Sequence, residues 1–410
     1  MGEDGLYAAL VARGMSRRTF LQFSSAMAAA LAMPLAYGPR IAAAVEAAPR
    51  IPVIWLRGQA CGGNSEALLR AGNPTTASLL LQVLAVDYDE SLMGAAGADA
   101  ELVRTSAMER YPNGYLAVIE GAVPKAAGGA MCLIGGRPFA DVAREVCDGA
   151  IATIALGSCA FDGGAPGANG GTTEAEGIRS VSGNSPVIAL PGCPANAENL
   201  AALIVHYATF KELPPTDLAG RPLFGYGELI HNKCERRPHF EFGEFALSWG
   251  DEGAQKGWCL YKLGCKGPET MGNCPTARYG GGVSWNIRAG HGCIGCFMPN
   301  FWDGYAPAYR RLGSPVPFMP TLTVDQVGLL AVGGIAGVAV AHGTGMASRS
   351  KYRARKARRA VQLAAAADGT PAGSVAAAEG DTAAGDVALA VGIPLAIPDD
   401  ADTRETSGEG

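Results

Sequence analysis

Charged residues are scarce in this chain of 410 residues, since Asp, Glu, Lys and Arg together make up 17%, against about 25% in a typical soluble domain. The formal net charge is −5, which would repel nucleic-acid phosphates, so we expect no nucleic-acid partner. Apolar residues make up 48%, which excludes a wholly disordered chain. The 11 cysteines are too sparse, and odd in number, for a small protein held together by disulfides, so their positions become the main functional signal.

Strand-like and helix-like segments alternate from residue 50 to about residue 215. Short apolar runs predict buried parallel strands at residues 51–56, 80–86, 116–119, 151–156 and 187–190. Helices are expected at residues 65–70, with Asn64 as a possible cap, and at 139–147 and 196–210. This alternation predicts an α/β domain built on an open, doubly wound parallel sheet.

Three cysteines of this domain each come shortly after a predicted strand: Cys61, Cys159 and Cys193. The carboxyl ends of parallel strands lie along one edge of the sheet, where ligands bind, so the three thiols should converge. Three convergent thiolates without a nearby histidine favour iron–sulfur chemistry over zinc or disulfides.

Residues 216–320 are rich in Gly, Pro, Cys and aromatic side chains, with little periodicity. Such a segment rarely forms a core from side chains alone, and metal clusters could supply the cross-links. Two potential ligand sets occur here. The first consists of His231, Cys234, Cys259 and Cys265, and the second consists of Cys274, Cys293 and Cys296. The C-x2-C spacing of the last pair is a strong metal signal. One Cys3His set alone could hold zinc, but two such sets beside a third favour a series of clusters that transfers electrons.

The two ends of the chain carry targeting features. Residues 1–49 contain a pair of arginines, Arg17-Arg18, then an apolar stretch and small residues at 42–44, an order typical of a twin-arginine export signal. The uncharged run 327–341, within a candidate anchor helix at residues 321–345, precedes seven basic residues, which favours a membrane anchor with its basic end in the cytoplasm. A buried core helix is the alternative. Residues 346–410 are basic and then of low complexity, and the tail is expected to be disordered.

The cysteine motifs, in their order and spacing, resemble those of NiFe hydrogenase small subunits over about residues 52–305. The matching segments are WLRGQACGGNSE at 55–66, YLAVIEGAVP at 115–124, ALGSCAFDGG at 155–164, LPGCPAN at 190–196, HNKC at 231–234, WCLYKLGCKGPET at 258–270, NCP at 273–275 and AGHGCIGCFMPNFWD at 289–303. The resemblance implies a flavodoxin-like domain at residues 50–215 and a second, irregular cluster domain at residues 216–320, followed by the C-terminal apolar helix.

The resemblance also implies a role for each ligand set. Cys61, Cys159 and Cys193 would hold the proximal cluster, nearest the active site of a large-subunit partner. The medial cluster would be held by Cys274, Cys293 and Cys296, and the distal 4Fe-4S cluster by His231, Cys234, Cys259 and Cys265. Replacing an anionic thiolate with neutral His231 should raise the potential of the distal cluster, as histidine ligands do in Rieske centres.

Three positions depart from the common family pattern. Asn64 stands where most members have a fourth proximal cysteine, so the fourth ligand could be Asp162, Asn64, or absent, which would leave a 3Fe-4S cluster. We favour Asp162, because a carboxylate is a better iron donor than an amide. In having a proximal site without a fourth cysteine, the chain resembles the actinobacterial-type, high-affinity uptake group. No extra cysteine is present near Asn64 or at Gly164, so the cysteine-rich proximal cluster of oxygen-tolerant members is not expected. Asn286 favours a 3Fe-4S medial cluster.

The function implied is an electron-transfer subunit that relays electrons from H2 oxidation in the large subunit to a quinone or cytochrome b-type acceptor. We expect a membrane-associated dimer or higher oligomer of heterodimers whose body is exported, or, alternatively, a protein at the cytoplasmic face that keeps its signal. Two other functions stay open, an iron–sulfur subunit of a membrane quinone reductase and a zinc-stabilised, membrane-tethered binding module. Cys132 and Cys147 are expected to be core thiols, and Glu66 and Glu120 to serve proton transfer, partner contact or salt bridges.

Overall fold

The computed structural model describes residues 17–47, 50–72, 75–76, 79, 83–312, 315–316 and 319–367. The chain divides into two units between Leu312 and Gly313. The first unit contains the sheet and all eleven cysteines, and the second contains a long helix.

A five-stranded parallel sheet forms the centre of the first unit, with the strand order β2-β1-β3-β6-β7. Its strands are β1 (Ile51–Arg57), β2 (Leu84–Asp89), β3 (Tyr115–Glu120), β6 (Ala150–Leu156) and β7 (Val187–Leu190). The predicted doubly wound α/β class is confirmed. Of the strand expected at residues 80–86, residues 84–86 belong to β2, which runs to Asp89, and residues 80–82 lie outside the described part of the chain.

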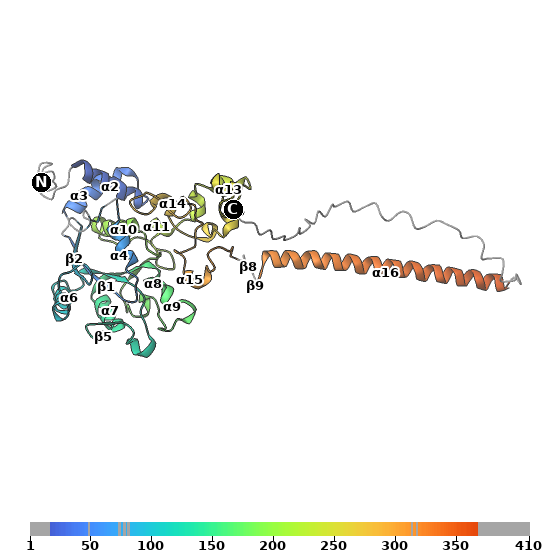
Figure 1. Cartoon of the computed structure of the whole chain (residues 1–410), viewed down its shortest axis with the longest axis horizontal. Helices are drawn as coiled ribbons and strands as arrows, with labels where there is room; N and C mark the ends of the chain where they lie inside the picture. The colour runs from blue at the N-terminus through green and yellow to red at the C-terminus, as the bar shows by residue number, and fades with distance from the viewer. Residues whose placement is uncertain are drawn as a thin grey trace, which may run out of the picture. The chain divides into compact units, whose positions relative to one another are not determined.

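Helices cover both faces of the sheet, as Figure 1 shows. They are α4 (Gly63–Leu69), α6 (Ala98–Arg110), α7 (Phe139–Asp148), α8 (Gly157–Asp162), α9 (Gly164–Gly167) and α10 (Ala197–Phe210). Successive strand residues alternate between two hydrophobic clusters: Trp55 packs on the side of α10, and Ile54 packs on the side of α7. A β4–β5 hairpin (Leu133–Ile134 and Arg137–Pro138) precedes α7.

The N-terminal segment forms a helical hairpin that packs against α10. It consists of α2 (Arg17–Ala30), η1 (Leu35–Tyr37) and α3 (Gly38–Ala47). Met27 and Ile41 are fully buried in the same core as the sheet. Ser16 of the predicted export motif lies outside the described residues.

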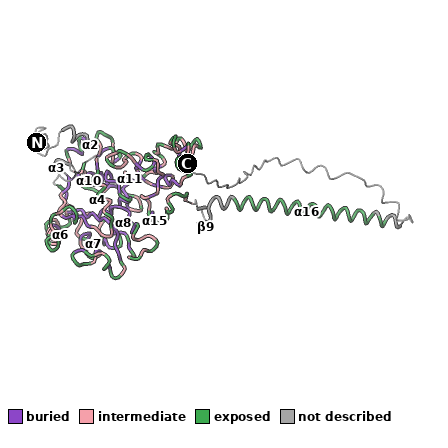
Figure 2. Tube along the Cα trace, in the orientation of Figure 1, coloured by how far each residue is buried: buried purple, intermediate pink, exposed green. Residues whose placement is uncertain are grey.

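Residues 216–312 have only short helices, as the composition of this region predicts. These are α11 (Leu223–Tyr226), η6 (Ile230–Lys233), α12 (Arg237–Glu241), α13 (Glu252–Gln255), η7 (Tyr261–Leu263), η8 (Gly267–Glu269), α14 (Cys274–Ala277) and α15 (Phe301–Gly304). The burial pattern in Figure 2 nevertheless shows many buried segments in this unit. The core of the sheet continues into this region through Tyr226, Ile230 and Phe297, so residues 216–312 are not packed as a separate core.

The second unit contains a two-stranded sheet, β8 (Pro315–Val316) with β9 (Met319–Thr323), and α16 (Val324–Ala367). Helix α16 includes the uncharged stretch 327–348 and the basic run from Arg349 to Arg359. The 22 uncharged residues of that stretch rise ~33 Å as a helix, enough for a bilayer core of about 30 Å. Large apolar side chains, including Leu329 and Ile335, are exposed on this helix, and residues 329–360 qualify as a candidate membrane span. The tail expected to be disordered was placed within residues 346–410, but α16 continues into it as far as Ala367. Residues 368–410 lie outside the described part of the chain.

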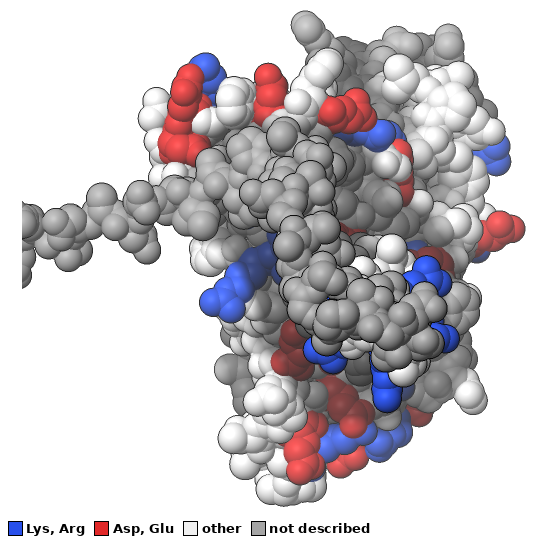
Figure 3. All heavy atoms as spheres, turned by 90° about the vertical axis from the view of Figure 1, so that its right-hand side faces the viewer, with Lys and Arg blue, Asp and Glu red and all other residues white. Residues whose placement is uncertain are grey.

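Charged side chains of both signs are interspersed over the face of the molecule drawn in Figure 3. Among the described residues, several charged side chains form exposed ion pairs, such as Arg70 with Glu66 and Lys256 with Glu252. Such exposed pairs contribute little to stability, typically about 0–1 kcal/mol each.

Candidate metal centres

The first group of cysteines lies along the carboxyl edge of the sheet. Cys61 follows β1, Cys159 lies in α8 directly after β6, and Cys193 follows β7. The structure brings them together, because the thiols of Cys61 and Cys193 both act electrostatically on Cys159. Cys61 and Cys193 are exposed, so this group faces the surface.

Burial and like-charge repulsion keep the thiols of Cys159 and Cys193 protonated when no metal is bound. Burial raises the pKa of Cys159 to about 11, and Cys193, Cys61 and Asp162 act in the same direction. Burial, with Cys61, also raises the pKa of Cys193. Cationic metal would reverse this effect, since coordinating thiols lose their protons. The donor set therefore fits a metal group that brings several positive charges.

Asp162 ends α8 beside Cys159. Its two carboxylate oxygens accept hydrogen bonds from the backbone N–H groups of Gly164 (3.1 Å) and Asn300 (2.6 Å). Burial raises the pKa of the Asp162 carboxyl, against the lowering effect of these hydrogen bonds. Each oxygen of a carboxylate has two lone-pair sites, so these contacts leave acceptor capacity for a metal.

Asn64 connects the strand ends beneath the three cysteines. Its side-chain N–H2 donates to Glu120 (3.2 Å) and to the carbonyl of Leu156 (3.4 Å), and its amide oxygen accepts from the N–H of Ala195 (2.8 Å). The prediction that Asn64 caps the next helix is wrong, because α4 begins at Gly63 with Gly62 as its N-cap. Tertiary hydrogen bonds to three other segments use the amide instead.

Two glycines are required near this group. Gly157 has φ +85°, and a Cβ there would lie 2.5 Å from the Asn64 amide nitrogen. Gly164 has φ +53°, and a Cβ there would lie 2.7 Å from the sulfur of Cys159. Gly164, the position of an extra cysteine in the cysteine-rich proximal cluster, therefore has no room for a side chain unless Cys159 moves.

The second group contains Cys274, Cys293 and Cys296, which interact electrostatically with one another. Cys274 and Cys293 are buried, and burial raises the pKa of both thiols. Burial also raises the pKa of Cys296 to about 11. The thiol of Cys293 lies 3.6 Å from the hydroxyl of Thr270.

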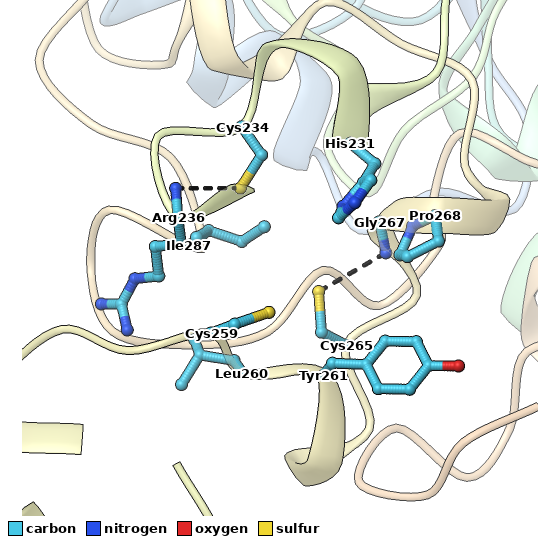
Figure 4. A pocket seen from close by; sticks show the side chains of 10 residues that line it. All are labelled: His231, Cys234, Arg236, Cys259, Leu260, Tyr261, Cys265, Gly267, Pro268 and Ile287. Carbon is cyan, nitrogen blue, oxygen red and sulfur yellow. Dashed lines mark hydrogen bonds between the residues drawn. The ribbon is translucent and has the colours of Figure 1, made fainter. Parts of the chain in front are cut away.

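The third group lines a pocket that is drawn in Figure 4. His231 lies in η6, Cys234 ends that turn, and Cys259 and Cys265 face them from the other side. Backbone N–H groups donate to two of the sulfurs, from Arg236 to Cys234 (3.4 Å) and from Gly267 to Cys265 (3.4 Å).

The electrostatics of the third group suit metal binding. Burial raises the pKa of Cys234 to about 11 and, together with Arg237, lowers the pKa of His231. A histidine with a lowered pKa is neutral near pH 7, which is the form that coordinates metals.

The donors around the pocket test which metal group fits it. Three thiols and an imidazole line it, from Cys234, Cys259, Cys265 and His231. Among the described residues, no three His, Cys, Asp or Glu side chains are arranged as ligands of one metal ion. Thiol donors of this kind suit an iron–sulfur cluster.

The three groups follow one another in space. The backbone N–H of Cys193 donates to the thiol of Cys296, which connects the first group to the second. The backbone N–H of Cys293 donates to the sulfur of Cys265 (3.3 Å), which connects the second group to the third. Ser158 reinforces the first connection, since its hydroxyl donates to the carbonyl of Cys296 (3.0 Å).

Several residues near the groups have structural partners. Glu120 is fully buried and forms an ion pair with Arg57 (3.4 Å), and Glu66 pairs with Arg70 at the surface (2.6 Å). The expected salt-bridge roles of both glutamates are thus present. Cys147 is a buried core thiol, as expected.

Cys132 and His291 also have local partners. Cys132 is partly buried against the same core as Cys147. His291 contacts the carbonyl of Gly292 (2.7 Å) through its Nδ1 atom.

Sequence reasoning missed two residues of this region. Lys266 is fully buried between Cys265 and the loop of Cys293, and Thr270 contacts both Lys266 and Cys293. The only sequence signal was the position of Lys266 beside a cysteine, because three of the four carbonyls that its ammonium contacts lie more than 40 residues further along the chain.

Family models match both parts of the first unit. Residues 226–309 match the C-terminal model of the NiFe/NiFeSe hydrogenase small subunit. Residues 61–207 match the model of the NADH ubiquinone oxidoreductase 20 kDa subunit. The first match contains the second and third ligand groups, and the second match contains the first group.

Curated relatives match most of the chain. The Hydrogenase-1 small chain of Citrobacter freundii is 41% identical over 370 residues, which cover 90% of this chain and 97% of the relative. The uptake hydrogenase small subunit of Azotobacter vinelandii is 42% identical over 339 residues, covering 83% and 94%.

Solved structures share the fold. A NiFeSe hydrogenase chain from Dm. baculatum superimposes with a TM-score of 0.60 at 30% identity, covering 64% of this chain and 100% of that one. An actinobacterial-type NiFe hydrogenase chain from Ralstonia eutropha H16 gives 0.59 at 23% identity, covering 72% and 92%, which shows a common fold. By the extent and identity of the curated matches together with its ligand groups, the chain belongs to the family of NiFe hydrogenase small subunits.

Proposed function

We propose that this chain is the electron-transfer small subunit of an uptake NiFe hydrogenase and relays electrons through three iron–sulfur clusters to a quinone-linked acceptor. H2 oxidation itself takes place in the large subunit. The observation that carries the proposal is the succession of three thiol-rich groups, joined by the hydrogen bonds from Cys193 to Cys296 and from Cys293 to Cys265. Iron–sulfur clusters supply one-electron chemistry when bound to such groups.

The ligand assignment follows the three groups. The proximal cluster, 4Fe-4S or 3Fe-4S, is assigned to Cys61, Cys159 and Cys193 with Asp162. The medial 3Fe-4S cluster is assigned to Cys274, Cys293 and Cys296, and the distal 4Fe-4S cluster to His231, Cys234, Cys259 and Cys265. The exposure of Cys61 and Cys193 supports the proximal assignment, because the large subunit would cover that surface.

Asp162 remains the proposed fourth proximal ligand. Its carboxyl acts electrostatically on Cys159, which supports a place beside the same cluster. Asn64 is the weaker candidate, because three tertiary hydrogen bonds already use both ends of its amide. An amide nitrogen, moreover, offers a metal no lone pair.

Helix α16 is the proposed membrane anchor. Its candidate span of residues 329–360 has no buried positions and ends in the basic run that favours the cytoplasmic side. Together with the arginine pair at residues 17–18, this supports export of the body by the twin-arginine route, with the tail returned to the cytoplasm. A dimer of heterodimers and a cytochrome b-type acceptor complete the proposal.

A quinone reductase subunit is the second candidate, since residues 61–207 match the NADH ubiquinone oxidoreductase 20 kDa model. The match of residues 226–309 to the hydrogenase C-terminal model favours the hydrogenase. Anaerobic purification through a tag on this chain separates the two. A co-purifying nickel-containing subunit with H2-dependent dye reduction supports the proposal, and a nickel-free complex with quinone reductase activity contradicts it.

A further inference from the structure

A lysine is completely buried between the second and third ligand groups. Lys266 has 0% exposure, and lysine is almost never fully buried unless it is paired. Its ammonium nitrogen contacts four backbone carbonyl oxygens, which belong to Gly264 (3.0 Å), Pro307 (3.0 Å), Ala308 (3.0 Å) and Arg310 (2.8 Å).

The carbonyl cage holds the protonated side chain. Four acceptors surround a group that has three hydrogens when charged, whereas a neutral amine would direct its lone pair at a carbonyl oxygen. Burial lowers the pKa of Lys266, but the cage provides the hydrogen-bond acceptors that a buried ammonium requires.

Among the described residues, no carboxylate forms an ion pair with Lys266. The nearest acid in sequence, Glu269, is paired with Arg311. Arg311 also lies over the Tyr261 ring, 3.8 Å from its centroid. The ammonium of Lys266 therefore has backbone carbonyls as its hydrogen-bond partners and no direct ion pair, while Glu269 and Arg311 act on it from further away.

The backbone of Lys266 connects the two ligand groups. Its N–H donates to the carbonyl of Cys293 (2.8 Å), and its carbonyl accepts from the hydroxyl of Thr270 (2.6 Å), which also contacts the Cys293 thiol. Because Cys265 is the preceding residue, the ammonium is fixed close to one ligand of each group. Both Cys265 and Cys293 act electrostatically on it.

Near the first ligand group, the charged side chains that act on Cys159 and Asp162 are carboxylates. Asp162 acts on the thiol of Cys159, and Asp303 acts on Asp162.

We propose that the buried charge of Lys266 raises the reduction potentials of the medial and distal sites relative to the proximal site, and so directs electrons away from the large subunit. The physical reason is that a fixed positive charge in a low-dielectric interior favours the addition of an electron nearby. The inference rests on the proposed function, because it requires clusters at the second and third groups.

Replacing Lys266 with methionine tests the inference in the anaerobically purified holoenzyme. The Lys266→Met side chain has a similar length and no charge. In a redox titration followed by electron paramagnetic resonance, the medial and distal signals should shift to more negative potentials, while the proximal signal shifts least. Lys262→Met is the matched control, since it removes an exposed lysine from the same segment, where solvent screens the charge.

A second variant covers a failure of Lys266→Met to assemble, which iron content would reveal. Ala308→Asp adds a carboxylate at a half-buried position whose carbonyl contacts the ammonium, and Ala308→Asn is its neutral counterpart. The Asp variant alone should shift the medial and distal signals negatively.

Unchanged potentials in assembled variants, or equal shifts of all three signals, would overturn the inference and leave the proposed function intact. If the unmodified holoenzyme lacked the medial and distal signals, this result would instead contradict the proposed function itself.

Discussion

At the scale of single residues, we expect the thiols at the carboxyl edge of the sheet, as the proposed proximal ligands, to determine whether electrons can leave the large subunit. Cys193→Ser should disrupt the proximal cluster and abolish H2-dependent dye reduction, because a protonated hydroxyl is a poor replacement for a thiolate ligand of iron. Dye-reduction assays of the purified complex check this. Cys132→Ser is the control, since Cys132 packs against the core away from the three groups. Full activity of Cys193→Ser would count against the assignment.

Asp162 and Asn64 have different expected roles at the same site. Asp162→Ala should change the proximal resonance signal only, because it removes the proposed fourth ligand. Asn64→Ala removes the hydrogen bond to Ala195 and its other tertiary contacts. It should leave the type of signal unchanged but lower stability by about 1–3 kcal/mol, the usual cost of leaving buried polar partners unsatisfied. Resonance spectra and thermal unfolding of both variants distinguish the ligand role of Asp162 from the structural role of Asn64. A changed signal in Asn64→Ala with an unchanged one in Asp162→Ala would reverse the ligand choice.

Whether the role of a residue could be predicted from the sequence depends on how far away along the chain its contact partners lie. The convergence of Cys61, Cys159 and Cys193 was predictable, because cysteines after parallel strands must meet at one sheet edge. The hydrogen bonds of Asn64 were not, since they reach Glu120, Leu156 and Ala195 in three separate segments. The carbonyl cage of Lys266 was hidden for the same reason.

At the scale of secondary-structure elements, strands were easier to predict than the N-terminal helices. β7 has the predicted bounds, β1 and β6 are longer by one residue at one end, and β3 is longer by one residue at each end, because short β-branched runs indicate buried strands clearly. α6 was missed, since its sequence has several charged residues and only a weak apolar stripe. The α2–α3 hairpin was missed because its apolar residues were interpreted only as an export signal.

The α2–α3 hairpin should protect its own candidate cleavage region. Ala42 lies inside α3 and is 4% exposed, and proteases act on backbone that has opened locally. Met27→Asp would place an unpaired charge in the core beside α10, which is strongly unfavourable, and should make residues 31–47 much more sensitive to limited proteolysis. Ala29→Asp, at an exposed position of α2, is the control. Equal sensitivity of both variants would show that the hairpin does not pack as described.

Helix α16 should determine membrane association on its own. A chain ending at Leu312 lacks the second unit and should appear in the soluble fraction with unchanged cluster spectra. A chain ending at Ala360 retains the candidate span and should stay in the membrane fraction. Fractionation and detergent extraction of the two truncated proteins compare them. Membrane retention of the shorter chain would place the anchor elsewhere.

At the scale of the whole molecule, the chain combines a sheet that presents one ligand group at its surface with an irregular region that contains two more. The irregular region has few regular hydrogen-bonded elements, and the bound clusters would cross-link it. Removal of iron by a chelator should therefore destabilise residues 223–312 more than the sheet. Hydrogen exchange of the loaded and iron-depleted protein measures this, and equal loss of protection in both regions would argue against a structural role for the clusters.

The central claim is that the three thiol groups hold iron–sulfur clusters in series. The most direct test is a redox titration of the anaerobically purified complex followed by electron paramagnetic resonance, together with iron, sulfide, zinc and nickel analysis. The account predicts a brown protein with three distinct iron–sulfur signals and a nickel-containing partner. A colourless protein with zinc or disulfides at these cysteines would contradict it.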